Sequence, residues 1–184
     1  MDRELNKLTK KLQAECYKEL CCIYSGTALT LKEWGWAEKR ISNLIREIGK
    51  VWHECGEKDT DVSILEMLEE ETGIELRLSM DGKSWHDLDY LNGSLSLYKV
   101  GKMTRAQAIY MRHQQIKWTG TLVQACTFLG LHRRFGFGPW RIKKVMDGIR
   151  EEREAFNNNH RKMLEACKKE TGVDIEEMIK QPAV

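Results

Sequence analysis

Proline and aromatic residues are scarce in this chain, and long apolar segments are missing. Of its 184 residues, two are proline and 8% are aromatic, a composition that excludes collagen-like and proline-rich linker proteins. The longest apolar runs, such as residues 20–24, fall far short of the roughly 18 residues that cross a bilayer. The charged N-terminus lacks the apolar core of a secretion signal. With 41% hydrophobic and 32% charged residues, we expect a soluble, folded protein of the cytoplasm.

Closely spaced cysteine pairs of the metal-binding kind are also missing. None of the six cysteines belongs to a Cys-x-x-Cys pair, the spacing that zinc sites and redox-active disulfides share. The adjacent Cys21 and Cys22 would point in different directions on a helix. Most of the six stand among apolar neighbours, where a free cysteine behaves as a small hydrophobic residue. The sequence therefore predicts reduced, buried thiols without a structural disulfide.

Acidic residues are almost absent from one part of the second half. Residues 99–150 contain 11 Lys/Arg and a single acid, Asp147, whereas residues 1–78 contain 12 Lys/Arg and 16 Asp/Glu. The formal net charge of +2 therefore hides an acidic first half and a basic second half. A dense basic segment with interleaved aromatic residues is typical of a nucleic-acid-binding face. The alternative is a solvated basic surface that is balanced by the acidic half docked against it.

An internal repeat organises the chain. Two pairs of segments align: residues 34–41, WGWAEKRI, with 135–142, FGFGPWRI, and residues 71–76, ETGIEL, with 170–175, ETGVDI. The offset between the copies is 101 residues in the first pair and 99 in the second. Shared order, spacing and residue type indicate that the chain contains two copies of one unit.

Hydrophobic periodicity predicts that each copy is helical. Apolar residues recur on one helical face at Ile41, Leu44, Ile45, Ile48, Trp52 and Cys55 in the first copy, and at Ile142, Val145, Met146, Ile149 and Phe156 in the second. A shorter helix is expected in each copy, at residues 62–72 and 160–171. Each ends at a Thr-Gly pair whose glycine, Gly73 or Gly172, takes the left-handed capping conformation.

Between the copies, the pattern changes to alternation. Apolar residues alternate before Asp81-Gly82 and after Asn92-Gly93, and both dipeptides are typical of tight turns. We therefore expect a short β-hairpin or an irregular bridge within residues 77–100. The predicted fold is mainly α, with two related helical lobes from an internal duplication: an acidic lobe at 1–78, a linker at 79–103 and a basic lobe at 104–184.

A glycine-aromatic corner separates two helical stretches of the second copy. Residues 135–138 read Phe-Gly-Phe-Gly and precede Pro139, which is favoured in the first turn of a helix. This arrangement resembles the helix–hairpin–helix motif, a family that binds duplex DNA without sequence preference. The resemblance implies that Gly136 and Gly138 let the backbone approach a phosphate, which amides at the start of the next helix would bind.

The resemblance is local and has departures. Phe135 stands where the motif has proline, and Ile142 stands where it has alanine. In the first copy the second glycine is Ala37, and Glu33 and Glu38 intrude among the basic residues, so we expect that copy to be structural or protein-binding. The alternative for both corners is a set of core aromatics that fix the angle between helices: Trp34, Trp36, Phe135 and Phe137.

The candidate residues for binding nucleic acid or a partner belong to the second copy. They are Arg112, Lys117, Trp118, Arg133, Arg134, Gly136, Gly138, Trp140, Arg141, Lys143 and Lys144. The cations would surround a phosphate. Trp118 and Trp140 would stack on bases or hold a cation, unless they cap an edge of the core.

A second resemblance covers more of the chain. Residues 131–142, together with 169–175 after the following helix, resemble small phage and prophage proteins of Gram-positive bacteria to which no chemistry is assigned. Short accessory phage proteins often bind DNA, replication machinery or host defence complexes, and anti-CRISPR inhibitors of CRISPR effector nucleases belong to this class. The resemblance therefore implies a bacterial host cell and a host nucleoprotein as a candidate partner.

No catalytic motif emerges from the sequence. The five histidines show no metal-ligand spacing, and the chain has neither a phosphate-binding loop nor a Ser-centred elbow. The best cluster of histidine and carboxylates, residues 86–89, falls in the turn-rich join, where such a run is usually solvated. We therefore expect a protein without enzymatic activity, metal or cofactor.

The leading hypothesis is a phage-type binding protein whose basic second copy engages the backbone of duplex nucleic acid or a nucleoprotein complex. A first alternative is an anti-CRISPR-like inhibitor that binds a CRISPR effector nuclease directly. A second is a structural dimerisation module, in which the acidic lobe of one chain contacts the basic lobe of another and salt separates the two.

Overall fold

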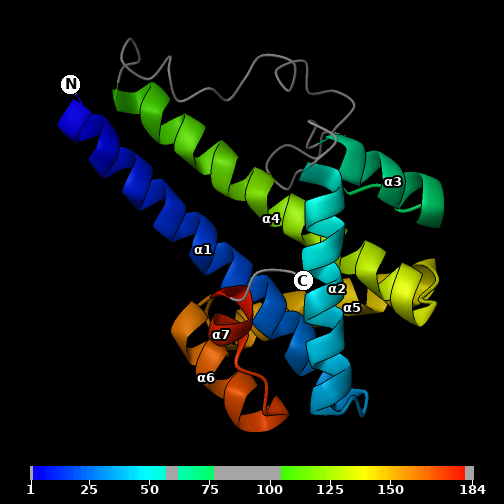
Figure 1. Cartoon of the computed structure of the whole chain (residues 1–184). Helices are drawn as coiled ribbons and strands as arrows, with labels where there is room; N and C mark the ends of the chain where they lie inside the picture. Colours follow the sequence, from blue (N-terminus) through cyan, green and yellow to red (C-terminus); the bar gives the residue numbers. More distant parts are fainter. Residues whose placement is uncertain (1, 57–61, 77–104, 181–184) are drawn as a thin grey trace.

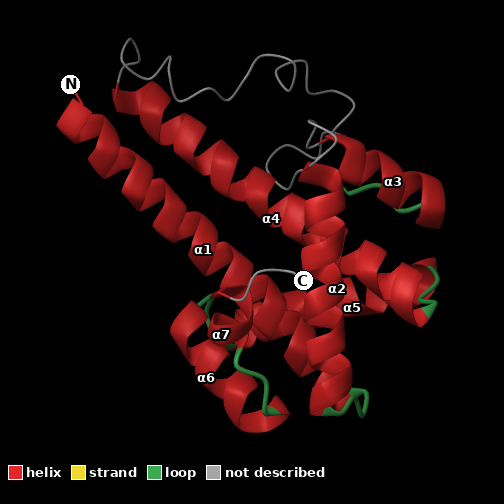
Figure 2. Cartoon of the chain, viewed as in Figure 1, coloured by secondary structure: helices red, strands yellow, loops and turns green. Residues whose placement is uncertain are grey.

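The computed structural model of the chain describes residues 2–56, 62–76 and 105–180 (Figure 1). The described residues form seven helices: α1 (Asp2–Glu33), α2 (Glu38–Gly56), α3 (Val62–Thr72), α4 (Arg105–Phe135), α5 (Pro139–Ala155), α6 (His160–Thr171) and α7 (Ile175–Lys180). Short loops join α1 to α2 and the helices from α4 to α7, and no strand occurs among the described residues (Figure 2). The prediction of a mainly α fold is confirmed, whereas the predicted β-hairpin lies outside the described residues.

The long helices α1 and α4 lie side by side, and the other helices pack around them (Figure 1). Each long helix carries short helices that come from the other half of the chain. Helices α2 and α3, which follow α1, pack on α4, while α5 and α6, which follow α4, pack on α1. Both halves contribute to one hydrophobic core. The two halves therefore interlock, because the apolar face of each short helix is buried against the long helix of the other half.

The apolar faces predicted for α2 and α5 are buried over most of their length. Ile41, Leu44 and Ile48 of α2 are fully buried, and the equivalent stripe of α5 begins after Pro139, which occupies the first turn. Trp52 was expected on the buried face of α2, but 44% of its surface is exposed. The expectation was wrong for Trp52, which lies in the last turns of α2 next to the buried Val51.

The Thr-Gly caps of α3 and α6 are confirmed. Gly73 and Gly172 have φ angles of +67° and +78°, which glycine adopts without the clash of a side chain. At the first cap, the Thr72 hydroxyl donates to the carbonyl of Leu68 at 2.6 Å and accepts from the amide of Ile74 at 3.2 Å. Thr171 makes the same pair of bonds at the second cap, at 2.7 and 3.1 Å.

Helix α7 was not anticipated from the sequence. It begins after Asp174, whose carboxylate accepts a hydrogen bond from the amide of Glu177 at 3.1 Å, the geometry of a helix N-cap. Asp174 and Glu177 form an acidic capping-box pattern that could have been recognised in the sequence. Among the seven described helices, no stretch combines the length and the apolar character that a bilayer-spanning helix requires.

Candidate nucleic-acid interface

Each long helix ends at a glycine corner. Gly35 and Gly136 have φ angles of +80° and +66°, a conformation that L side chains rarely adopt. At the first corner, the amides of Gly35 and Trp36 donate to the carbonyls of Lys32 and Leu31 at 2.9 and 3.0 Å. These are the two hydrogen bonds of a Schellman cap, which ends α1 and turns the chain into α2.

The second corner ends α4 in a related way. The amides of Gly136 and Phe137 donate to the carbonyls of His132 and Leu131 at 2.9 and 3.2 Å. Two of the hairpin amides that the helix–hairpin–helix resemblance would offer to a phosphate are therefore already used. The backbone donors that remain are the first-turn amides of α5, which have no intrahelical acceptor, and Gly138 stands at the N-cap of that helix.

The two corners pack against each other through four aromatic rings. The rings of Trp34 and Phe137 are stacked, with their centroids 6.1 Å apart, and Trp36 contacts Phe135 and Phe137 at 4.8 and 5.7 Å. Trp36 and Phe137 are only 5% and 4% exposed, as expected of core aromatics. Trp34 differs, because 41% of its surface is exposed.

An open groove of about 520 Å³ lies where the corners meet, and we call it the corner groove. Its lining comes from both halves: Trp34, Trp36, Arg40, Phe137, Trp140, Arg141 and Lys144. Four of these side chains are aromatic and three are cationic, and none is acidic. Trp140 is 70% exposed, which is the highest value among the exposed large hydrophobic side chains of the described residues.

The cations of the groove lie over its aromatic rings. The guanidinium of Arg40 is 4.1 Å from the centroid of the Trp36 ring, and that of Arg141 is 5.7 Å from the Phe137 ring. The ammonium of Lys144 is 5.9 Å from the Trp140 ring. Such contacts attract a cation to the ring face without neutralising its charge. Arg40 and Arg141 stand 101 residues apart, at matching positions of the two copies.

Two further predicted cations flank the second corner. Arg134 lies in the last turn of α4 and Lys143 in the second turn of α5, and both are exposed. Within the described ranges, neither of them takes part in an ion pair, and the same holds for the three cations of the corner groove. The second corner is thus flanked by positive charges that form no ion pair with a described carboxylate.

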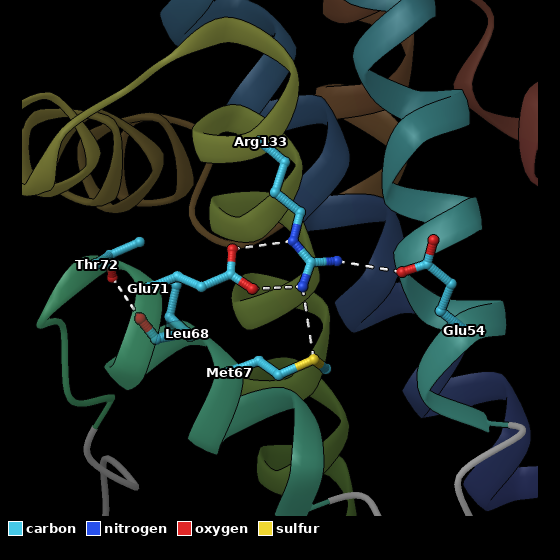
Figure 3. Close-up of polar contacts among 6 residues, drawn as sticks. All are labelled: Glu54, Met67, Leu68, Glu71, Thr72 and Arg133. Atoms are coloured by element: carbon cyan, nitrogen blue, oxygen red, sulfur yellow. Dashed lines mark hydrogen bonds and ion pairs between the residues drawn. The ribbon is translucent and has the colours of Figure 1, made fainter.

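Arg133 is different, because the chain's own carboxylates hold it (Figure 3). Its Nε and Nη2 donate to the two oxygens of Glu71 at 3.0 and 2.5 Å, and its Nη1 donates to Glu54 at 3.1 Å. Nη2 also lies 3.5 Å from the sulfur of Met67. These contacts tie α4 to both α3 and α2. Arg133 was also predicted to bind nucleic acid, and in the structure its guanidinium is bonded to these two carboxylates.

The Arg133–Glu71 pair is expected to make stability depend on pH. The hydrogen bond from Arg133 holds the pKa of Glu71 below its usual value of 4.5. The stabilisation is therefore complete above about pH 4.5 and is lost as the pH falls through the lower pKa of the folded state. Thermal melts near neutral pH should give Glu71→Gln a free energy of unfolding that is lower than that of the wild type by about 1 kcal/mol or less, because the pair is partly exposed. The two melting curves should converge in acid.

The expectation would be contradicted if the stability of the wild type and that of Glu71→Gln changed with pH in parallel. A matched control is Glu66→Gln, which removes an exposed carboxylate from the same helix. Its pH profile should follow that of the wild type.

The remaining predicted residues do not join the corner groove. Trp118 is buried in the core at 6% exposure. Lys117 is half-buried and lines a second groove of about 610 Å³, whose lining has no residue in common with that of the corner groove. The side chain of Arg112 lies outside the described residues. Trp118 therefore belongs to the hydrophobic core.

The part of the chain that the structure describes contains no group of three His, Cys, Asp or Glu side chains that could hold a metal. The five described cysteines, all except Cys55, form no disulfide with one another. Burial raises the pKa of Cys21 and Cys167 to about 11, so these thiols stay protonated at neutral pH and make poor nucleophiles. The His and carboxylate cluster at residues 86–89 lies outside the described residues.

Sequence reasoning missed the contribution of the first half to this site. Trp34, Trp36 and Arg40 were assigned to a structural or protein-binding copy, and in the structure they form one side of the corner groove. The aligned segments carried a usable signal, because Arg40 matches Arg141. The alignment could not show that the two corners contact each other in the folded chain.

Comparison with protein-family models, curated proteins and solved structures finds no match to this chain, so its function has to be argued from its own residues.

Proposed function

We propose that the chain binds nucleic acid through a cationic face around the second corner. We define this cationic face by its five exposed basic residues: Arg40, Arg134, Arg141, Lys143 and Lys144. One observation carries the proposal, namely that these cations lie together around one corner and that none of the five has a carboxylate partner among the described residues. By contrast, Arg133, Arg150, Arg153 and Lys168 are each paired with an acid.

Unpaired charges of one sign repel each other and destabilise a compact fold. A chain with 28 Asp/Glu residues has enough carboxylates to neutralise such a group, so a cationic face that pairs with none of the described carboxylates fits an external polyanion better than a structural role. The phosphates of a nucleic acid supply regularly spaced negative charge. Exposed basic side chains recognise the charge of the phosphates, which is the same for every sequence. We therefore expect an affinity with weak sequence preference and a steep dependence on salt concentration.

The test is removal of charge from the cationic face. The variant Arg134→Ala/Arg141→Ala/Lys143→Ala/Lys144→Ala should weaken binding to a fluorescent DNA duplex by about 100-fold at low salt, because contacts to several phosphates are lost together. The slope of log affinity against log salt should fall by about one for each lost contact. Fluorescence anisotropy at several salt concentrations measures both quantities.

A second quadruple variant serves as the control, since it removes the same charge elsewhere. It replaces the exposed residues Arg46, Lys50, Arg161 and Lys162 by alanine, and its affinity should stay within a few-fold of the wild type. Equal losses in the two variants would mean that only net charge matters. A different outcome would favour the anti-CRISPR-like alternative instead. In that case the wild type would not bind DNA, but it would still capture a protein of a host nucleoprotein complex after nuclease treatment.

We also infer that the two halves arose by duplication of one helical unit. Matching glycines take the left-handed conformation in both halves, and Thr72 and Thr171 make the same cap. Within the long helices, the hydroxyls of Thr27 and Thr127 donate to the carbonyl four residues earlier, each at 2.7 Å. The exchange of short helices between the long ones follows the same symmetry, since α2 lies on α4 as α5 lies on α1.

A further inference from the structure

We propose that the corner groove binds an unpaired nucleotide base, so that the preferred ligand is a single-stranded stretch of nucleic acid. This inference rests on the proposed function and adds to it the part of the ligand that the groove would recognise. The cationic face accounts for binding to phosphates in any nucleic acid. It does not account for the tryptophans beside it.

The first observation is the exposure of two large rings in a groove between cations. Trp140 is 70% exposed and Trp34 is 41% exposed, although burying a tryptophan ring is strongly favourable. Phosphates gain nothing from an aromatic face. Bases do, because every base has a π face that stacks on an aromatic side chain.

The second observation is the charge of the lining. Arg40, Arg141 and Lys144 lie among the rings, and like charges repel, so the groove would reject a cationic ligand such as a methylated lysine, for which aromatic cages are otherwise suited. An acidic peptide would satisfy the cations but leave the exposed rings in water. A nucleotide satisfies both, because its base is aromatic and its phosphate is anionic.

The third observation is size and accessibility. A groove of about 520 Å³ is within the range of pockets that hold small ligands, so it has room for a base. In a duplex the faces of the bases are stacked inside the helix and must be extruded, at a cost in free energy, before a protein can reach them. Unpaired bases bring their faces to the groove without that cost, which predicts a preference for single strands.

The experiment compares two probes of equal length, an oligothymidylate of about 15 nucleotides and a duplex of the same length. Trp140→Ala should weaken binding of the oligothymidylate about tenfold and leave duplex binding within twofold of the wild type. Trp140→Phe keeps an aromatic face and should retain most of the affinity. The salt slope should be unchanged in both variants, since neither removes a charge.

Trp52→Ala is the matched control, because Trp52 is another exposed tryptophan, at 44%, and is not part of the groove lining. Its affinity for both probes should equal that of the wild type. Trp140 is largely exposed, so its replacement should leave the core intact, and a circular dichroism melt for each variant checks this.

The outcomes separate the two proposals. If Trp140→Ala changes neither probe, or both by the same factor, the base-binding role is overturned, while the proposed function stands as long as the charge variants lose binding. If the wild type binds neither probe, both proposals are overturned. If polyglutamate binds as tightly as oligothymidylate and suffers the same loss in Trp140→Ala, the groove recognises an acidic protein and the inference is overturned.

Discussion

Gly148→Ala is expected to destabilise the fold, although alanine is the better helix former. Gly148 lies where α5 crosses α1, and a Cβ atom there would come within 2.7 Å of the Thr30 hydroxyl oxygen and would also press on its methyl group. Thr30 is buried, at 2% exposure, and has little freedom to move away. Overpacking of this kind costs about 1–3 kcal/mol, and the gain in helix propensity offsets about 1 kcal/mol of it. Chemical denaturation should show a net loss in the free energy of unfolding.

A compensating change identifies the clash as the cause. Thr30→Ala removes both crowded atoms, and its hydroxyl is a buried group for which the described residues provide no hydrogen-bond partner. The double variant Thr30→Ala/Gly148→Ala should therefore be more stable than Gly148→Ala alone. Gly130→Ala is the control, since Gly130 also lies within a helix and a Cβ there meets no atom closer than 3.5 Å. Wild-type stability in Gly148→Ala would show that the two helices separate without cost.

Arg153→Met is expected to cost about 2 kcal/mol, the second large effect on stability. The Arg153 guanidinium binds both oxygens of Glu19, at 2.6 and 3.0 Å, and so connects α5 to α1. The two side chains are only 22% and 21% exposed. Removing the cation leaves a carboxylate that is partly withdrawn from water and has lost its two charged hydrogen bonds, worth about 1.5–3 kcal/mol.

A double-mutant cycle with Glu19→Gln measures the coupling between the two side chains. Glu19→Gln/Arg153→Met should be less destabilised than the sum of the single variants, because no charge is then left alone. The surface pair of Lys18 and Glu15, with side chains 44% and 39% exposed, is the comparison. Lys18→Met should change stability by no more than about 0.5 kcal/mol. Additive effects at Arg153 and Glu19 would contradict the expectation.

Local features of the fold could be predicted from the sequence. The spans of α3 and α6 agree with the predicted 62–72 and 160–171, because a Thr-Gly pair determines the end of each helix through contacts with its own last turn. Pro139 likewise predicted the start of α5, because proline is favoured in the first turn of a helix and acts locally. Periodicity identified which face of α2 is buried, but it contained no information about the helix that covers this face.

The candidate site could be predicted only in part, because its decisive contacts join distant residues. Arg133 and Arg134 are adjacent and chemically alike, yet the first is held by carboxylates 62 and 79 residues away and the second is not paired within the described residues. Arg40 reaches the groove only because two corners 101 residues apart pack together. Sequence spacing cannot predict which of the two arginines is paired, whereas the contacts of Arg133 with Glu71 and Glu54 in the structure show it.

The interlocking of the halves has a consequence for how a partner meets this protein. Because the short helices of each half lie on the long helix of the other, neither half can swing aside as a detachable arm. The carboxylates of α3, a helix without any basic residue, therefore stay at fixed positions relative to the cationic face. A polyanion that binds as proposed would be repelled by α3 and attracted by the cationic face, so α3 would restrict its direction of approach.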